Sequence, residues 1–153
     1  MQSHGKDLKG KTLAYFAGVA TAAITAAATG DDTEIVGDTI DLTTLAARPS
    51  SVLFVVPVRA TLAATKTCIV TGLIEKSADG TNWSDLVASA TLLTLLGGEG
   101  GTTEKGVAEI GGDLINSDCR YIRYKATPDL NASGTDTMQV GGAVAVFGGL
   151  QTT

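Results

Sequence analysis

Five carboxylates within eleven residues form the densest group of side chains that could do chemistry. They are Asp31, Asp32, Glu34, Asp38 and Asp41. Carboxylate oxygens are the ligands that a hard cation such as Ca²⁺ prefers. Their order, however, lacks the alternating oxygen ligands before a glycine that a calcium loop requires. We therefore interpret the group as a solvated strand face and predict no metal site.

The glycine-rich run Gly97-Gly98-Glu99-Gly100-Gly101 is the next candidate, because backbone amides in such a run can cradle a phosphate. A phosphate-binding loop of this kind ends in Gly-Lys-Ser/Thr. In this chain Gly106 is followed by Val107. We predict a flexible loop and no bound cofactor.

Catalytic residues are scarce. The only histidine, His4, lies three residues from the start, and no nucleophile has a histidine to activate it. No pair of acids is flanked by apolar residues that would raise one pKa. We therefore expect no enzyme activity. Cys68 and Cys119 have no C-x-x-C spacing, which favours two reduced, packed thiols, although one disulfide stays open.

The chain is acidic, with 11 Lys and Arg against 16 Asp and Glu and a net charge of -5. Nucleic-acid binding depends on basic side chains that displace counterions from phosphates, so we expect no nucleic-acid partner. The one basic cluster is Arg120, Arg123 and Lys125. On a strand, Arg123 and Lys125 share a face, where they could meet an acidic neighbour; otherwise that face is solvated.

Residues 1–32 differ in kind from the rest of the chain. Lys6, Lys9 and Lys11 precede an Ala/Thr-rich stretch that has no clean helical stripe. The pattern superficially imitates a secretion signal, but Asp7 interrupts the basic region and threonines interrupt the apolar one. Threonine and glycine also recur in every window long enough to span a bilayer, so we expect no membrane association. We interpret residues 1–32 as an extended N-terminal arm, in which one short helix stays open.

Residues 33–150 read as a single β-sandwich domain, followed by a short tail at 151–153. A chain of 153 residues is normally one domain, and runs of about 4–10 residues between turn residues are typical of all-β folds. We predict one antiparallel sandwich, immunoglobulin-like or jelly-roll-like. One strand places Val52, Phe54, Val56 and Val58 on one face, and its Pro57 predicts an edge strand or a bulge.

Four further elements follow from the same patterns. Residues 67–76 form a strand with Cys68, Val70 and Ile74 on one face. Asp79-Gly80 forms a hairpin turn, after which Trp83 returns to the core. The stretch 86–96 favours a strand over a helix. Residues 120–127 place Ile122, Tyr124 and Ala126 on one face. The last strand, 137–147, alternates Met138, Val140, Val144 and Val146, with a bulge at Gly141-Gly142.

The order of turn and strand-edge residues also resembles a known group. The segments that carry the resemblance are Ala60-Thr61-Leu62-Ala63, Ser77-Ala78-Asp79-Gly80-Thr81-Asn82-Trp83-Ser84-Asp85, Cys119-Arg120-Tyr121-Ile122-Arg123-Tyr124, Thr127-Pro128-Asp129-Leu130, Gly134-Thr135-Asp136-Thr137 and Val144-Ala145-Val146-Phe147-Gly148-Gly149. Over residues 33–150 the chain is similar to small structural proteins of tailed bacteriophages, in length and layout to their capsid decoration, or cement, proteins. None of these segments is catalytic.

The resemblance implies a β-sandwich that binds the outer surface of an icosahedral phage head and reinforces it, often as a homotrimer. The implied partners are the major capsid protein and further copies of the chain. For the contacts with capsid or neighbouring subunit we single out Leu13, Tyr15 and Phe16 of the arm, together with Arg123 and Lys125. Two other functions stay open, namely a tail or baseplate component and a carbohydrate-binding adhesion module.

Overall fold

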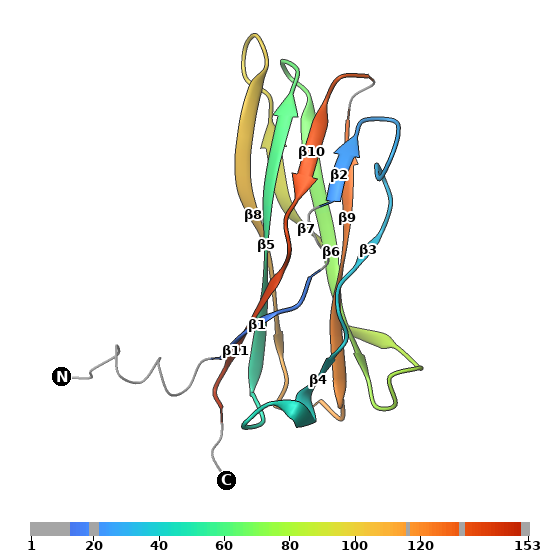
Figure 1. The fold of residues 1–153 in the computed structure, drawn as a ribbon, viewed down its shortest axis with the longest axis vertical. Coiled ribbons are helices and arrows are strands. Elements are labelled where there is room, and N and C mark those ends of the chain that lie inside the picture. Colours follow the sequence, from blue (N-terminus) through green and yellow to red (C-terminus); the bar gives the residue numbers. More distant parts are fainter. Residues whose placement is uncertain (1–12, 19–21, 116, 132–133, 151–153) are drawn as a thin grey trace, which may run out of the picture.

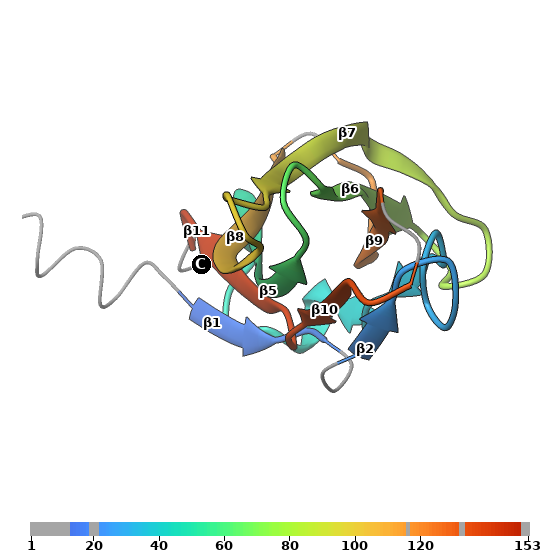
Figure 2. The same ribbon diagram turned by 90° about the horizontal axis from the view of Figure 1, so that it is seen from above.

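The computed structural model describes residues 13–18, 22–115, 117–131 and 134–150, and it is a sandwich of two antiparallel sheets (Figure 1). The first sheet, sheet A, contains β1 (Leu13–Phe16), β2 (Ala22–Thr25), β5 (Ser51–Leu62), β8 (Thr102–Asp113), β10 (Thr137–Val140) and β11 (Val144–Gly148). Sheet B contains β3 (Ile35–Val36), β4 (Ile40–Asp41), β6 (Thr67–Ser77), β7 (Ser84–Leu96) and β9 (Tyr121–Leu130). The predicted all-β antiparallel sandwich is confirmed. Seen from above, the two sheets enclose one core (Figure 2).

Strand β5 is the centre of sheet A, and its alternation follows from the sequence pattern. Val52, Phe54, Val56 and Val58 are all buried, as predicted, while the residues between them point outward. In the core, Phe54 meets Tyr124 of β9 from the opposite sheet, with ring centroids 5.4 Å apart. Apolar side chains from both sheets thus fill the space between them.

The prediction that Pro57 marks an edge strand or a bulge in its own strand is wrong. Strand β5 pairs with β8 along its whole length on one side and with β10 and β11 on the other. The Pro57 carbonyl accepts a hydrogen bond from the Gly141 amide, at the point where β10 gives way to β11. A residue's N and carbonyl point to the same side of a strand, so the missing N–H of Pro57 faces this break. The irregularity lies in the neighbouring strand.

That break also changes which residues face the core. The bulge predicted at Gly141-Gly142 is confirmed, because four residues from Val140 to Val144 advance the chain opposite only three of β5, from Val58 to Val55. Met138 and Val140 are buried, but beyond the break the buried residues are Ala143, Ala145 and Phe147. The prediction that Val144 and Val146 continue the inward face is therefore wrong. One extra residue at the break moves every later side chain to the other face.

Strands β6 and β7 form the predicted hairpin. Gly80 in its turn has a φ of +76°, and Asp79 Oδ1 accepts hydrogen bonds from the Thr81 and Asn82 amides at 2.8 Å each. The stretch 86–96 is a strand, as favoured. Trp83, however, does not return to the core. It lies half-buried at the surface, where the Arg123 guanidinium stacks 3.9 Å from its ring centroid.

The described part of the predicted arm belongs to sheet A. Strand β1 pairs with β11 and β2 pairs with β10, so both lie at the border of the sheet opposite β8. Residues 13–18 and 22–32 contain no helix. The beginning of the arm and the predicted tail at 151–153 lie outside the described residues. In the part of the chain that the structure describes, no helix has the length and apolar character needed to cross a membrane.

Candidate interaction surfaces

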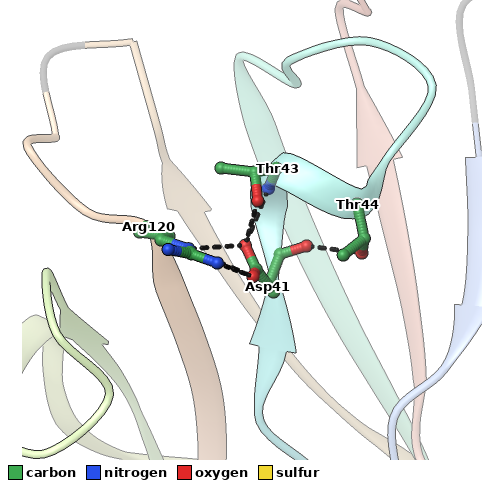
Figure 3. A network of polar contacts seen from close by, with 4 residues as sticks. All are labelled: Asp41, Thr43, Thr44 and Arg120. Carbon is green, nitrogen blue, oxygen red and sulfur yellow. Dashed lines mark hydrogen bonds and ion pairs between the residues drawn. The ribbon is translucent and has the colours of Figure 1, made fainter.

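Asp41 is the centre of a polar network at one end of the sandwich (Figure 3). Its carboxylate accepts hydrogen bonds from the Thr43 amide at 2.9 Å and the Thr43 hydroxyl at 2.7 Å, and so caps the short 3₁₀ helix η1 (Leu42–Thr44). Arg120, the residue before β9, donates from Nε and Nη2 to the same carboxylate, at 2.7 Å for the shortest contact. The network fastens β4 and the following turn to β9.

Arg120 also shapes the electrostatics of this end. Its hydrogen bonds, with those from Thr43, hold the pKa of Asp41 well below its ordinary value of 3.8. A hollow of about 550 Å³ lies beside the network, lined by residues that include Arg48, Cys119 and Arg120. The Arg48 guanidinium donates to the Ser117 carbonyl, so both guanidinium groups are occupied by protein acceptors. The network serves to hold the turn.

Removing the charge of Asp41 should make stability less sensitive to acid. The folded-state pKa is depressed, so the ion pair stabilises the fold fully above pH 3.8, and that contribution is lost as the pH falls below it. Asp41→Asn keeps an oxygen for the Thr43 amide but loses the ion pair. We expect thermal unfolding to show a lower midpoint than wild type at pH 7 and a shrinking difference towards pH 2. Asp38→Asn is the control, with a midpoint at pH 7 close to wild type; an Asp41→Asn difference independent of pH would contradict the assignment.

The five clustered carboxylates do not form one group. Asp41 pairs with Arg120, and Glu34 pairs with Lys125 at 3.0 Å. Asp31 accepts the Ala27 amide at 2.7 Å with one oxygen and the Leu130 amide at 2.8 Å with the other. Asp31 and Asp32 lie close to Asp129, which the sequence cluster did not include. Burial, with Asp32 and Asp31 nearby, raises the pKa of Asp129.

The outward face of sheet B carries a group of charged residues that pair with one another. Arg123 Nε lies 2.7 Å from Glu75 Oε2, and Lys125 Nζ lies 3.3 Å from the other oxygen of Glu75. Lys125 also contacts Glu34, and this hydrogen bond is the main cause of its raised pKa. The expectation that Arg123 and Lys125 share a face and could meet an acidic neighbour is thus confirmed. Arg123, Lys125, Glu75 and Glu34 thus form one connected ion-pair network.

Sheet A presents a different outward face. Its centre is apolar and comes from three neighbouring strands, with Leu53 and Val55 on β5, Val144 and Val146 on β11, and Val107 on β8. Val107 is 46% exposed and Leu53 is 36% exposed. Around it lie three exposed charged residues, Arg59, Lys105 and Glu109, none of which forms an ion pair among the described residues. We call this surface the A face.

The predicted contact residues fall on both sheets. The backbone of Leu13, Tyr15 and Phe16 forms β1, in which Phe16 lies opposite Val144 of β11. Their side chains lie outside what the structure describes. Arg123 and Lys125 belong to β9 of sheet B, so the structure does not bring the two groups together on one sheet. The A face was missed, because β11 was assigned the wrong inward face.

Both cysteines are free and buried, which confirms the predicted thiols. Cys68 Sγ lies 2.9 Å from Met138 Sδ, whereas Cys119 Sγ donates to the Ser117 hydroxyl at 3.1 Å. Burial raises the pKa of Cys68 to about 11. Such a thiol stays protonated near neutral pH and packs as a small apolar group.

No protein-family model matches the chain, and neither does any curated protein. Among solved structures, it is similar to the VP2 subviral particle of infectious bursal disease virus, with 12% identity and a TM-score of 0.48 over 90% of this chain and 32% of that one. It is similar to the PBSX exported protein XepA, with 17% identity and a TM-score of 0.45 over 87% and 38%. A further similarity is to Eiger TNF from S. frugiperda, with 9% identity and a TM-score of 0.38 over 94% and 96%. The chain thus spans about a third of the length of the VP2 and XepA chains.

Proposed function

We propose that the chain is a structural protein of a virus particle, and more specifically a decoration protein that binds the outer surface of an icosahedral phage head. The observation that carries the proposal is the apolar area of the A face that Leu53, Val55, Val144 and Val146 form on the neighbouring strands β5 and β11. On the outward face of sheet B, by comparison, Arg123 and Lys125 are already paired with Glu75. An exposed apolar patch with a polar rim is typical of a protein-binding surface.

The resemblance of the turn and strand-edge residues to decoration proteins supports the same function. A decoration protein works by binding, and it needs a rigid scaffold with a surface that fits its neighbours. The implied partners are the major capsid protein and further copies of the chain, as a homotrimer. In this role no acid-base pair, metal or cofactor is needed, so we propose no enzyme activity.

We place the capsid contact on the part of the A face next to β1. Leu53 and Val146 lie opposite one another on β5 and β11, and Val146 lies opposite the exposed Ala14 of β1. Leu13, Tyr15 and Phe16 belong to the same border strand, so the proposed arm contacts adjoin this apolar area. Arg123 and Lys125 are the less favoured contacts, because breaking their pairs with Glu75 would oppose binding.

A shell-binding experiment tests the contact. Val146→Asp puts a charge into the proposed apolar interface, and we expect it to reduce occupancy on purified shells that lack the chain by at least tenfold, as judged by co-sedimentation. The matched control is Val36→Asp, at an exposed valine of sheet B. Both variants should unfold close to the wild-type temperature. Equal occupancy of Val146→Asp and wild type would remove the A face from the contact.

Two other functions make different predictions. A tail or baseplate component would be present in few copies per particle, whereas a decoration protein covers the shell. A carbohydrate-binding module needs an aromatic ring whose face is free to stack on a sugar. The Trp83 ring is covered by Arg123 and the Tyr121 ring by Arg120, at 3.9 and 4.9 Å from their centroids. Each guanidinium takes one face of its ring away from a sugar, which counts against carbohydrate binding at these two residues.

A further inference from the structure

Strand β8 forms a long border of sheet A. Its twelve residues pair with β5 without a break, from Asp113 opposite Ser51 to Thr102 opposite Leu62. On its other side β8 has no strand partner among the described residues, and Figure 1 shows it at the lateral border of the sandwich. The backbone N–H and C=O groups along such a border are free to pair with another strand.

The long border strand of sheet B is less suited to pairing. Strand β7 shifts register against β6 at three places along its length. Such bulges twist and bend a strand, which is one way in which proteins prevent pairing at a border. Strand β8 has no register shift against β5. Of the two long border strands, β8 is therefore the one whose backbone is regular enough to pair with another strand.

The charged outward side chains of β8 are arranged so that two copies of the strand can pair with opposite charges facing each other. Val107 lies between Lys105 and Glu109, which are the preceding and following residues on the same face. When two copies of β8 run antiparallel with Val107 opposite Val107, Lys105 of each copy lies opposite Glu109 of the other. Opposite charges in such cross-strand pairs stabilise, and like charges destabilise.

The two other symmetric pairings centred on neighbouring outward residues of β8 do not place opposite charges against each other. Centring the pair on Lys105 would place lysine against lysine, and centring it on Glu109 would place glutamate against glutamate. Lys105 and Glu109 also form no ion pair within the described part of their own chain, so both are available to a partner. A two-fold axis at Val107 is the arrangement that uses both charged groups.

We propose that β8 pairs with β8 of a second copy of this chain about a two-fold axis at Val107, so that sheet A continues across both copies. The contact is isologous and joins chains in pairs. It uses the border of sheet A opposite β1, so it leaves the proposed capsid contact free. The pairing does not rest on the proposed function, and the proposed homotrimer would use a different surface.

Sedimentation-velocity analysis of the purified full chain tests the pairing. We expect the wild type to sediment as an even number of chains. Val107→Arg sets two arginines against each other at the axis, and Lys105→Glu creates two like-charge pairs. Each should weaken the association at least about tenfold and halve the mass at a concentration where the wild type is paired. The control, Val36→Arg on sheet B, should keep the wild-type mass.

The double variant Lys105→Glu with Glu109→Lys separates pairing from misfolding. It exchanges the charges and restores both opposite-charge pairs, so we expect it to recover the wild-type mass. Circular dichroism of every variant should retain the β-sheet spectrum. A wild type that stays a single chain at its highest soluble concentration overturns the proposal. So does an unchanged mass in Val107→Arg, or a double variant that dissociates like Lys105→Glu.

Discussion

Replacing Phe54 by alanine is expected to lower the free energy of unfolding by about 3–5 kcal/mol. Phe54 is fully buried on the central strand of sheet A, and its ring meets Tyr124 of sheet B. The substitution removes apolar contacts and leaves a cavity between the two sheets, which the surrounding strands can close only in part. The loss is large because β5 is paired on both sides and has little freedom to move inward.

The measurement is the urea unfolding of the wild type and of Phe54→Ala, monitored by circular dichroism. Leu53→Ala is the matched control, because Leu53 is the preceding residue of the same strand and points outward, 36% exposed. The control should lose much less stability than Phe54→Ala. Similar losses in the two variants would mean that β5 does not separate a buried from an exposed face.

Replacing Gly18 by alanine, which adds one methyl group, is expected to detach residues 13–18 from the sandwich. We expect it to lower the free energy of unfolding by about 1–3 kcal/mol. A Cβ at Gly18 would clash with the backbone nitrogen of Ala143. The contact is with backbone, so no side chain can rotate away. The adjacent Ala17 amide donates to the Ala143 carbonyl at 3.0 Å, and this hydrogen bond holds the segment at the break between β10 and β11.

Limited proteolysis with mass spectrometry is the readout for Gly18→Ala, because a detached segment is cleaved earlier than the sandwich. Gly111→Ala is the control. A Cβ there meets its nearest atom at 3.5 Å, an ordinary contact. Cleavage of Gly18→Ala at the wild-type rate would show that residues 13–18 do not depend on this packing.

The faces of β5 and β9 could be predicted from the sequence, because each strand alternates over its whole length, and the face of β6 could be predicted as far as Glu75, where its alternation ends. Strand β11 could not, since one extra residue at the break after Val140 reverses its faces. The role of Pro57 likewise depends on a neighbouring strand about 80 residues further along the chain, where Gly141 lies. A local pattern does not show which strand will be the neighbour.

The N-terminal strands were missed for a different reason. Strand β2 is short and rich in alanine, so its alternation is weak, and its place comes from pairing with β10. The cap at Asp41 could have been found, because an aspartate before Leu42-Thr43-Thr44 is a typical start of a helical turn. Its partner Arg120 lies 79 residues away, and no spacing rule joins the two.

Cryo-electron microscopy of the intact virus particle is the most direct test of the central claim, that this chain is a structural protein on the outside of a capsid. We predict density for the two-sheet sandwich at regular positions over the outer shell surface, with the side of the A face that includes Leu53 and Val146 against the major capsid protein. Particles whose shell carries no such density, or in which the sandwich occurs only in the tail, would contradict the claim.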